Sequence, residues 1–292
     1  MTTPLDEVLD ILDLERLEAN LFRGRSPHED RQRAFGGQVA AQALVAAVRT
    51  VDAEGGDVHS LHAYFLRPGD VQVPIIYEVD RTRDGRSFST RRVVAIQHGK
   101  AIFTLSASFH RREPGYEHQL PMPEAPDPET LPTWNETMAP LLKDAPEGLR
   151  KWVLRERPFD IRYVGKPDWI DRRPLEPWRM VWIRADGKLV DDPMVHEVLV
   201  AYASDMMLLD TALRPHAVSV ADHGGMLASL DHAMWFHREF RADEWLLYAM
   251  ESPSSGGARG FATGRFFTRD GRLAVSVAQE GLIRPPRGKE TT

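Results

Sequence analysis

The sequence has no cysteine among its 292 residues. Disulfide bonds, thiolate zinc sites and cysteine nucleophiles are therefore excluded. No apolar run approaches the ~18 residues of a membrane-spanning helix, and Met1 to Asp13 lacks the basic and apolar regions of a signal peptide. A net charge of −6 provides no positive surface for nucleic acid or an anionic membrane. We therefore expect a cytoplasmic protein with no nucleic-acid partner and no membrane partner.

Two catalytic patterns are also missing. There is no G-x-S-x-G motif, so a hydrolase with a serine nucleophile elbow is unsupported. The histidines lack metal-ligand spacing, because His59 and His62 would lie on opposite faces of a strand, as would His232 and His237. We therefore expect neither a metal nor a cofactor.

A buried helix is predicted at Phe35–Val48. Two glycines form a plausible entry turn, Ala and Leu favour helix, and past Gln42 no polar side chain occurs before Arg49. A helix that is apolar on all sides is buried rather than laid on a surface. Its length of roughly 20 Å matches the width of four or five strands.

Strands are predicted around this helix from their β-branched and aromatic residues and from the turns between them. One short strand precedes the helix and four follow it: Leu17–Arg25, then Val58–Leu66, Val73–Arg83, Ser87–His98 and Ala101–Arg112. From Pro114 to Pro146 the chain contains eight prolines. Such a segment does not fit a sheet, so we predict an ordered or semi-ordered linker.

The same order of elements returns after the linker. Two strands, an apolar helical run and four further strands are predicted at Phe159–Val164, Trp178–Arg184, His196–Leu213, Ser229–His237, Trp245–Ser252, Arg259–Arg269 and Leu273–Arg284. Residue matches support a duplication, since Phe65 and Phe236, Arg67 and Arg238, and Tyr77 and Tyr248 are each 171 apart, and Gly99 and Gly271 are 172 apart.

An internal repeat determines the architecture. We predict an α+β fold of two tandem antiparallel sheets, each wrapped on a central helix and joined as one continuous sheet. The predicted units are an N-terminal one at 1–113, the Pro-rich linker at 114–157 and a C-terminal one at 158–292.

Two polar residues interrupt apolar faces in the second half. Asp205 lies in the predicted helix, where burying a carboxylate is costly. Gln279 lies on the face of the last strand that is otherwise apolar. Each could be structural, as an ion pair or a bonded core amide, but two in one half favour an active site. Asp231, which shares a predicted strand face with Ser229, is a rival carboxylate.

Five segments in order resemble bacterial acyl-CoA thioesterase II, the TesB family, over about Leu17 to Arg284. They are Phe35-Gly36-Gly37-Gln38, Ala201-Tyr202-Ala203-Ser204-Asp205, Asp231 to Arg238, Ala258-Arg259-Gly260-Phe261 and Val277-Ala278-Gln279-Glu280-Gly281. The resemblance implies a double hotdog fold and hydrolysis of acyl-CoA thioesters, with medium- to long-chain fatty acyl groups expected. It also implies an Asp, a Thr and a Gln that hold and activate water.

Carried over by motif, the family Asp and Gln fall on Asp205 and Gln279, and the Thr falls on Ser229. Serine keeps the hydroxyl but lacks the methyl that stiffens the Thr rotamer. Thioester hydrolysis needs an aimed water and a group that takes its proton. Asp205 can accept that proton while Ser229 and Gln279 orient the water, without a covalent acyl-enzyme.

Four further residues are candidates for substrate binding. Backbone N–H groups near Gly37 and Gln38, at a helix N-terminus, could stabilise the oxyanion. Gly257 and Arg259, in and after a glycine-rich loop, could approach a phosphate, although a flexible turn and a solvated strand face are alternatives.

One active site per chain is predicted. The repeat register places Asp205 opposite Gln38, Gln279 opposite Ala107 and Ser229 opposite Val58, so the first half lacks all three groups. We expect acyl-CoA as the substrate and a homo-oligomer, dimer or tetramer.

Two rival functions remain open. One is a hotdog enoyl-CoA hydratase, whose acid-proline-histidine motif is faintly matched by Asp192 to His196 with the wrong spacing. The other is a non-catalytic acyl-CoA-binding protein, because polar residues could hold the ligand without turnover.

Overall fold

The computed structural model of the chain describes residues 2–27, 33–52, 55–167, 173–218 and 227–284. The first half contains two helices and six strands: α1 (Pro4–Leu12), β1 (Glu15–Glu18), β2 (Leu21–Gly24), α2 (Gly36–Val48), β3 (Asp57–Phe65), β4 (Ile75–Asp84), β5 (Phe88–Gln97) and β6 (Lys100–His110). The linker holds short helices: η1 (Pro128–Thr130), α3 (Trp134–Met138), η2 (Pro140–Leu142) and α4 (Glu147–Leu154). The predicted single opening strand is therefore a two-stranded hairpin, β1–β2.

The second half repeats the plan of the first. Its elements are β7 (Phe159–Tyr163), β8 (Trp178–Ala185), α5 (Pro193–Ser204), η3 (Leu209–His216), β9 (Leu227–Ser229), β10 (Asp231–Phe236), β11 (Leu246–Gly256), β12 (Arg259–Thr268) and β13 (Leu273–Ile283). None of the described helices is both long and apolar enough to cross a bilayer.

All the described strands form one antiparallel sheet. Its order is β1-β2-β4-β5-β6-β3-β10-β13-β12-β11-β8-β7, and β9 pairs with β13. The halves join where β3 pairs with β10, with Ala233 opposite His62. The predicted α+β fold, two sheet units wrapped on central helices and joined as one sheet, is confirmed.

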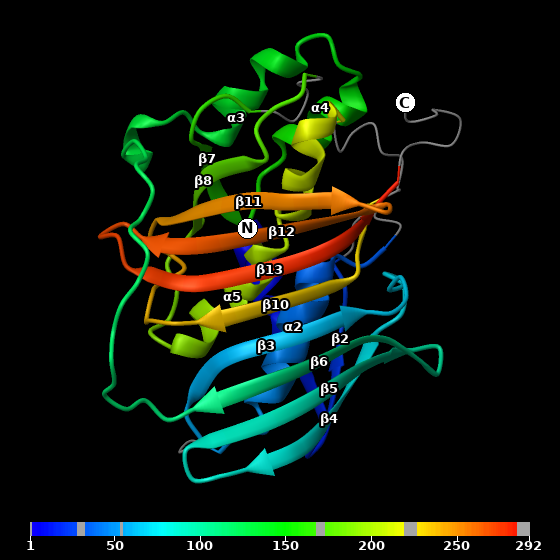
Figure 1. Cartoon of the computed structure of the whole chain (residues 1–292). Helices are drawn as coiled ribbons and strands as arrows, with labels where there is room; N and C mark the ends of the chain where they lie inside the picture. The colour runs from blue at the N-terminus through cyan, green and yellow to red at the C-terminus, as the bar shows by residue number, and fades with distance from the viewer. Residues whose placement is uncertain (1, 28–32, 53–54, 168–172, 219–226, 285–292) are drawn as a thin grey trace.

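The central helices lie together on one side of this sheet (Figure 1) and pack against each other. In α2 every residue from Gly37 to Ala47 is buried, as the apolar run predicts. The strands of the first half cover α2 on its other sides, with Phe22, Leu61 and Phe103 in the shared core. The site described below lies where α2 begins and α5 ends.

The helix predicted at His196–Leu213 is shorter in the structure, and this prediction was wrong. The α-helix stops at Ser204, because Met207 has a φ of 66°, which an α-helix cannot continue. The Tyr248 hydroxyl donates to the Ser204 carbonyl oxygen at 2.7 Å and so satisfies the helix end. Asp205 is therefore the C-terminal cap residue of α5 rather than a residue of its interior.

The strand predicted at Ser229–His237 is interrupted. It consists of β9 and β10, which are separated at Leu230. An irregularity in the pairing with β13, described below, causes the break.

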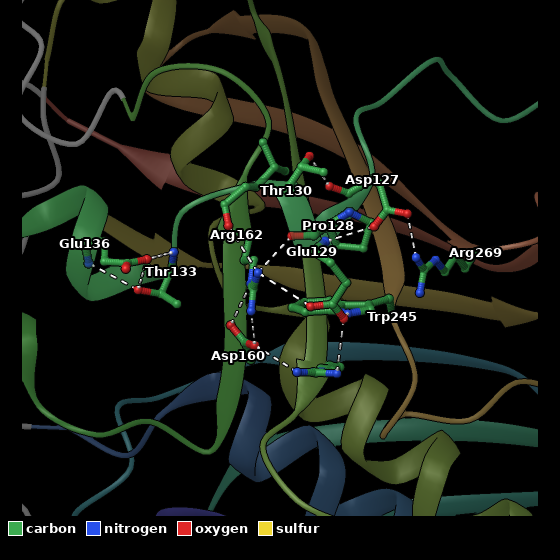
Figure 2. Close-up of polar contacts among 12 residues, drawn as sticks. Asp127, Pro128, Glu129, Thr130, Thr133, Glu136, Asp160, Arg162, Trp245 and Arg269 are labelled. Carbon is green, nitrogen blue, oxygen red and sulfur yellow. Dashed lines mark hydrogen bonds and ion pairs between the residues drawn. The ribbon is translucent and has the colours of Figure 1, made fainter.

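The linker packs on the outer face of the second half (Figure 2). Trp245 donates from Nε1 to Glu129 Oε1 at 2.8 Å, and this bond, the largest cause, lowers the pKa of Glu129. Arg162 donates to the Pro128 carbonyl oxygen at 2.9 Å, and Arg269 pairs with Asp127 at 2.6 Å. These contacts hold the proline-rich segment over a small second core formed by Trp182, Trp245, Leu247 and Phe267.

Candidate active site

The start of α2 has no capping side chain of its own. Its N-cap residue, Phe35, makes no side-chain hydrogen bond to the first turn. The Gly37 N–H instead donates to Asp205 Oδ2 at 2.8 Å, across the two halves. A carboxylate at a helix N-terminus is stabilised by the helix dipole and by the unpaired N–H groups there. Asp205 therefore supplies the hydrogen-bond acceptor that the N-cap residue of α2 lacks.

Gly36 lets this carboxylate come close to the helix. A Cβ atom at Gly36 would lie 2.7 Å from Asp205 Oδ2 and 3.0 Å from the Phe65 ring. Any larger residue would displace the carboxylate or the ring. The pair of glycines thus admits an acid from the other half, in addition to forming a turn.

The Gln279 side chain links the other two predicted catalytic residues, Asp205 and Ser229. It is fully buried on β13, and its Nε2 donates to Asp205 Oδ1 at 2.6 Å and to Ser229 Oγ at 3.1 Å. Because a carboxylate only accepts hydrogen bonds, the amide nitrogen must face Asp205. The amide oxygen, Gln279 Oε1, then has no partner among the described residues. The structure thus brings Asp205, Ser229 and Gln279 together, although Ser229 and Asp205 lie on different segments.

Two buried side chains, those of His232 and Tyr248, contact Ser204, the residue before Asp205. His232 Nε2 lies 2.8 Å from the Ser204 hydroxyl, and burial lowers the pKa of His232 against the opposing charge of Asp205. Burial, aided by the charge of Asp205, raises the pKa of Tyr248 well above its usual value. At neutral pH both groups are therefore uncharged, and neither adds a charge next to Asp205.

A cavity of about 320 Å³ opens beside Ser229. It lies between the start of α2, the connection after β3 and strand β9, and its lining includes Gly36, Phe65, Arg67, Ile102, Leu227 and Ser229. Small-molecule sites usually measure ~300–1,000 Å³, so this cavity can hold only part of a large ligand. Its walls are largely apolar, with two arginines, Arg33 and Arg67, among the lining residues.

Three of the other candidates make contacts elsewhere. The Gln38 side-chain amide donates to the Arg25 carbonyl oxygen and to Ser26 Oγ, at 3.2 and 3.1 Å, and these bonds do not involve the backbone N–H that was predicted as an oxyanion donor. Arg259 forms an exposed ion pair with Glu280 at 2.9 Å. Gly257 occupies the turn before β12 with a φ of 57°. The Gly37 N–H is already bonded to Asp205, so it is not available as an oxyanion donor in this arrangement.

Asp231 does not reach the site. Its Oδ1 accepts the Glu280 N–H at 2.7 Å, on the adjacent strand. The sequence analysis also missed Arg67 and Phe65 as lining residues of the cavity. Their repetition as Arg238 and Phe236 is the sequence signal that marks this pair. No group of three His, Asp or Glu side chains in the described ranges is arranged to hold a metal ion.

Two family models match the chain. Residues 171–282 match the model of acyl-CoA thioesterase, and residues 25–110 match that of the acyl-CoA thioesterase N-terminal domain. Acyl-coenzyme A thioesterase 8 of Rattus norvegicus is 46% identical, over 97% of this chain and 91% of its own. Acyl-CoA thioesterase 2 of Haemophilus influenzae is 41% identical, over 97% of this chain and 99% of its own.

Solved structures are similar over the same length. The acyl-CoA thioesterase II TesB2 of Mycobacterium marinum has 46% identity and a TM-score of 0.78, covering 97% of this chain and all (100%) of that one. A hot dog fold protein of Alicyclobacillus acidocaldarius has a TM-score of 0.76 at 19% identity, over 98% of this chain and 100% of its own, which shows a shared fold alone.

Proposed function

The chain belongs to the acyl-CoA thioesterase family, and we propose that it hydrolyses fatty acyl-CoA with water activated by Asp205, Ser229 and Gln279. The observation that supports this proposal is the Gln279 amide, which bridges the Asp205 carboxylate and the Ser229 hydroxyl beside a cavity. A carboxylate held by two N–H donors, those of Gly37 and Gln279, is positioned to take a proton from a water bound beside it.

In the proposed reaction the water gives one proton to Asp205 as its oxygen attacks the thioester carbonyl carbon. The Gln279 Oε1 atom and the Ser229 oxygen orient that water. The tetrahedral intermediate then collapses, the C–S bond breaks, and the CoA sulfur leaves with the proton that Asp205 had taken. The products are a free fatty acid and CoA, and no bond to the protein forms.

We propose medium- to long-chain acyl groups as substrates. The cavity beside Ser229 is lined by Val39, Phe65, Ile102 and Leu227, which suit a hydrocarbon. Two arginines, Arg33 and Arg67, also line the cavity and could contact a polar part of the substrate. A volume of about 320 Å³ is too small for a whole acyl-CoA, so the cavity would hold only the portion near the thioester.

The test is release of free thiol from palmitoyl-CoA, followed with a thiol reagent, and then from a series of acyl chains from C4 to C18. We expect steady thiol release that is greatest for the medium or long chains. A hydratase acting on an enoyl-CoA, or a protein that only binds acyl-CoA, would release none.

The absence of an acyl-enzyme is tested separately. Enzyme quenched in acid during turnover should keep its own mass, and hydrolysis in ¹⁸O-labelled water during a single turnover should place one ¹⁸O atom in every fatty acid molecule and none in the protein. A mass increase equal to the acyl group would contradict direct attack by water.

Size-exclusion chromatography with light scattering would test the predicted dimer or tetramer.

A further inference from the structure

The pairing of β13 with its neighbours contains one extra residue next to the site. Ser229 pairs with Gly281, and Ala233 pairs with Ala278. The chain therefore advances four residues from Ser229 to Ala233 while the partner strand advances three. One strand with an extra residue is a β-bulge, which changes the direction of the side chains around it.

The bulge decides which way Ser229 points. In an uninterrupted strand, Ser229 and His232 would face opposite sides of the sheet. In the structure both face the end of α5, since Ser229 Oγ is bonded to Gln279 and His232 Nε2 lies 2.8 Å from Ser204 Oγ. Without the extra residue, either the serine or the buried histidine would have to leave this side.

Asp231 closes the bulge. Its Oδ1 accepts the Glu280 N–H at 2.7 Å, and the Leu230 N–H donates to the Glu280 carbonyl oxygen at 2.9 Å. The Leu230 carbonyl oxygen in turn accepts the Phe65 N–H at 2.9 Å. The side chain thus supplies the acceptor for the N–H of the residue that follows Gln279.

We propose that Asp231 is a positioning residue for hydrolysis, which holds the bulge so that Ser229 and Gln279 meet at Asp205. It acts through the Glu280 N–H and contacts neither the substrate nor the water. The inference rests on the proposed function, because it concerns the geometry of that reaction. It also replaces the role of rival base that the sequence suggested for Asp231.

The test compares Asp231→Ala with Asp231→Asn in the full chain. Alanine removes the acceptor, so kcat for palmitoyl-CoA should fall about ten- to a hundredfold, as expected for groups displaced by up to ~1 Å, while KM changes by less than about twofold. Asparagine keeps an acceptor oxygen for the Glu280 N–H. It should restore kcat to within about threefold of wild type, with the pH profile of kcat unchanged.

A double-mutant cycle identifies the route of the effect. Asp231→Ala in the Gln279→Ala background should lower kcat by less than about threefold, because its contribution passes through Gln279. Glu251→Ala is the matched control, an exposed strand acid bonded to the side chains of Arg265 and Thr263, and should leave kcat unchanged.

The outcomes separate the proposals. Wild-type turnover together with an unchanged Asp231→Ala variant would overturn the positioning role alone. If the Asn variant is as slow as the Ala variant, and the effects of Asp231→Ala and Gln279→Ala on kcat are fully additive, Asp231 acts as a base. That result would also overturn the positioning role. No thiol release from wild-type protein would overturn the proposed function and this inference with it. If Asp231→Ala melts early, the Asn variant still decides, because loss of kcat there contradicts the proposal.

Discussion

The two central helices are antiparallel partners, and their two junctions differ in how each helix begins. At one junction α2 begins at Phe35, which cannot cap it, and Asp205 from the end of α5 accepts the Gly37 N–H. At the other junction α5 begins at Asp192, whose own side chain accepts the Met194 N–H at 3.0 Å. The first helix start therefore takes its acid from the other half, and the second does not.

The opposite helix ends differ in the same way. The C-cap residue of α5 is Asp205, whereas that of α2 is Arg49. Arg49 turns to the Leu14 carbonyl oxygen and to Asp13, at 2.6 and 2.5 Å. When the helix ends are aligned, Asp205 corresponds to Arg49, whereas the repeat register of the sequence places it opposite Gln38.

A cavity accompanies each junction. The second, of about 270 Å³, is lined by His196, Glu197, Arg112 and Arg238 among others. Arg238 repeats Arg67 of the first cavity, since Arg67 donates to the Ala101 carbonyl oxygen and Arg238 to that of Leu273. The duplication has therefore preserved two comparable clefts.

The charge differs between the clefts. Burial, with a smaller contribution from Asp57, raises the pKa of Glu197 to about 8, so this acid is mostly protonated at pH 7. Asp205, in contrast, faces a helix N-terminus and two donors. The comparison teaches that the two acids differ in their surroundings: burial dominates around Glu197, whereas Asp205, the proposed base, accepts two N–H hydrogen bonds.

The largest expected effect is the loss of turnover in Asp205→Asn. Removing a general base costs ~10²–10⁴-fold in rate, so kcat for palmitoyl-CoA should fall by about that factor with the fold intact. Glu197→Gln is the matched control in the other cleft and should leave kcat within about twofold. Steady-state kinetics and circular dichroism of both variants provide the measurement. Near-normal turnover in Asp205→Asn would refute the assigned base.

The second effect concerns stability and pH. Because the folded-state pKa of Glu197 is raised from 4.5 to about 8, its proton is bound more tightly in the folded than in the unfolded chain. Its contribution to the free energy of unfolding is therefore full below pH ~4.5 and is lost as the pH rises towards ~8. Glu197→Gln should be more stable than wild type by roughly 4 kcal/mol at pH 8 and about equal at pH 4.5.

Urea unfolding at several pH values measures this difference. Glu244→Gln, at an exposed acid that lines the same cavity, is the control and should leave the pH dependence unchanged. A difference between wild type and Glu197→Gln that does not vary with pH would contradict a buried, protonated Glu197.

Most of the fold could be predicted from the sequence, because each half repeats a strong local pattern. The apolar run at Phe35–Val48 predicted α2 within one residue, and the four strands after it lie within two residues of their predicted ends. The end of α5 could not be predicted in this way. Apolar residues continue past Ser204, and the left-handed turn at Met207 depends on tertiary contacts such as the Tyr248 hydroxyl.

The site was predictable in its residue types but not in its geometry. An acid and an amide on apolar faces identified Asp205 and Gln279 as unusual. The period-two rule, however, grouped Ser229 with Asp231, because an extra residue in a strand leaves no mark in hydrophobic alternation. The bond from Gly37 to Asp205 was also hidden, since it joins residues 168 positions apart. The missing cap at Phe35 was its one visible sign.

The third effect, at Ser229, is smaller. If its oxygen orients the water, Ser229→Thr should keep or improve kcat, because the β-branch narrows the rotamers. Ser229→Val keeps that shape but has no hydroxyl. Its activation free energy should rise by ~1–3 kcal/mol, the cost of an unsatisfied buried group, and kcat should fall accordingly. Ser229→Ala should behave like Val. The measurement is kcat of the three variants on one long-chain acyl-CoA, with thermal melts to exclude misfolding. If the Ala variant has the kcat of wild type while the Thr variant is impaired, Ser229 is a packing residue.

The smallest effect is a factor of two in binding stoichiometry, and it tests the comparison directly. The described residues that line the second cleft include Glu197, which is mostly protonated at pH 7, but no glutamine and no serine. We therefore expect calorimetric titration with a non-hydrolysable acyl-CoA analogue to give one site per chain. The Asp205→Asn variant should keep that single site, because the base is needed for the reaction rather than for binding. Two equivalent sites per chain would mean that the clefts differ in chemistry alone and that the second has kept its affinity for the substrate.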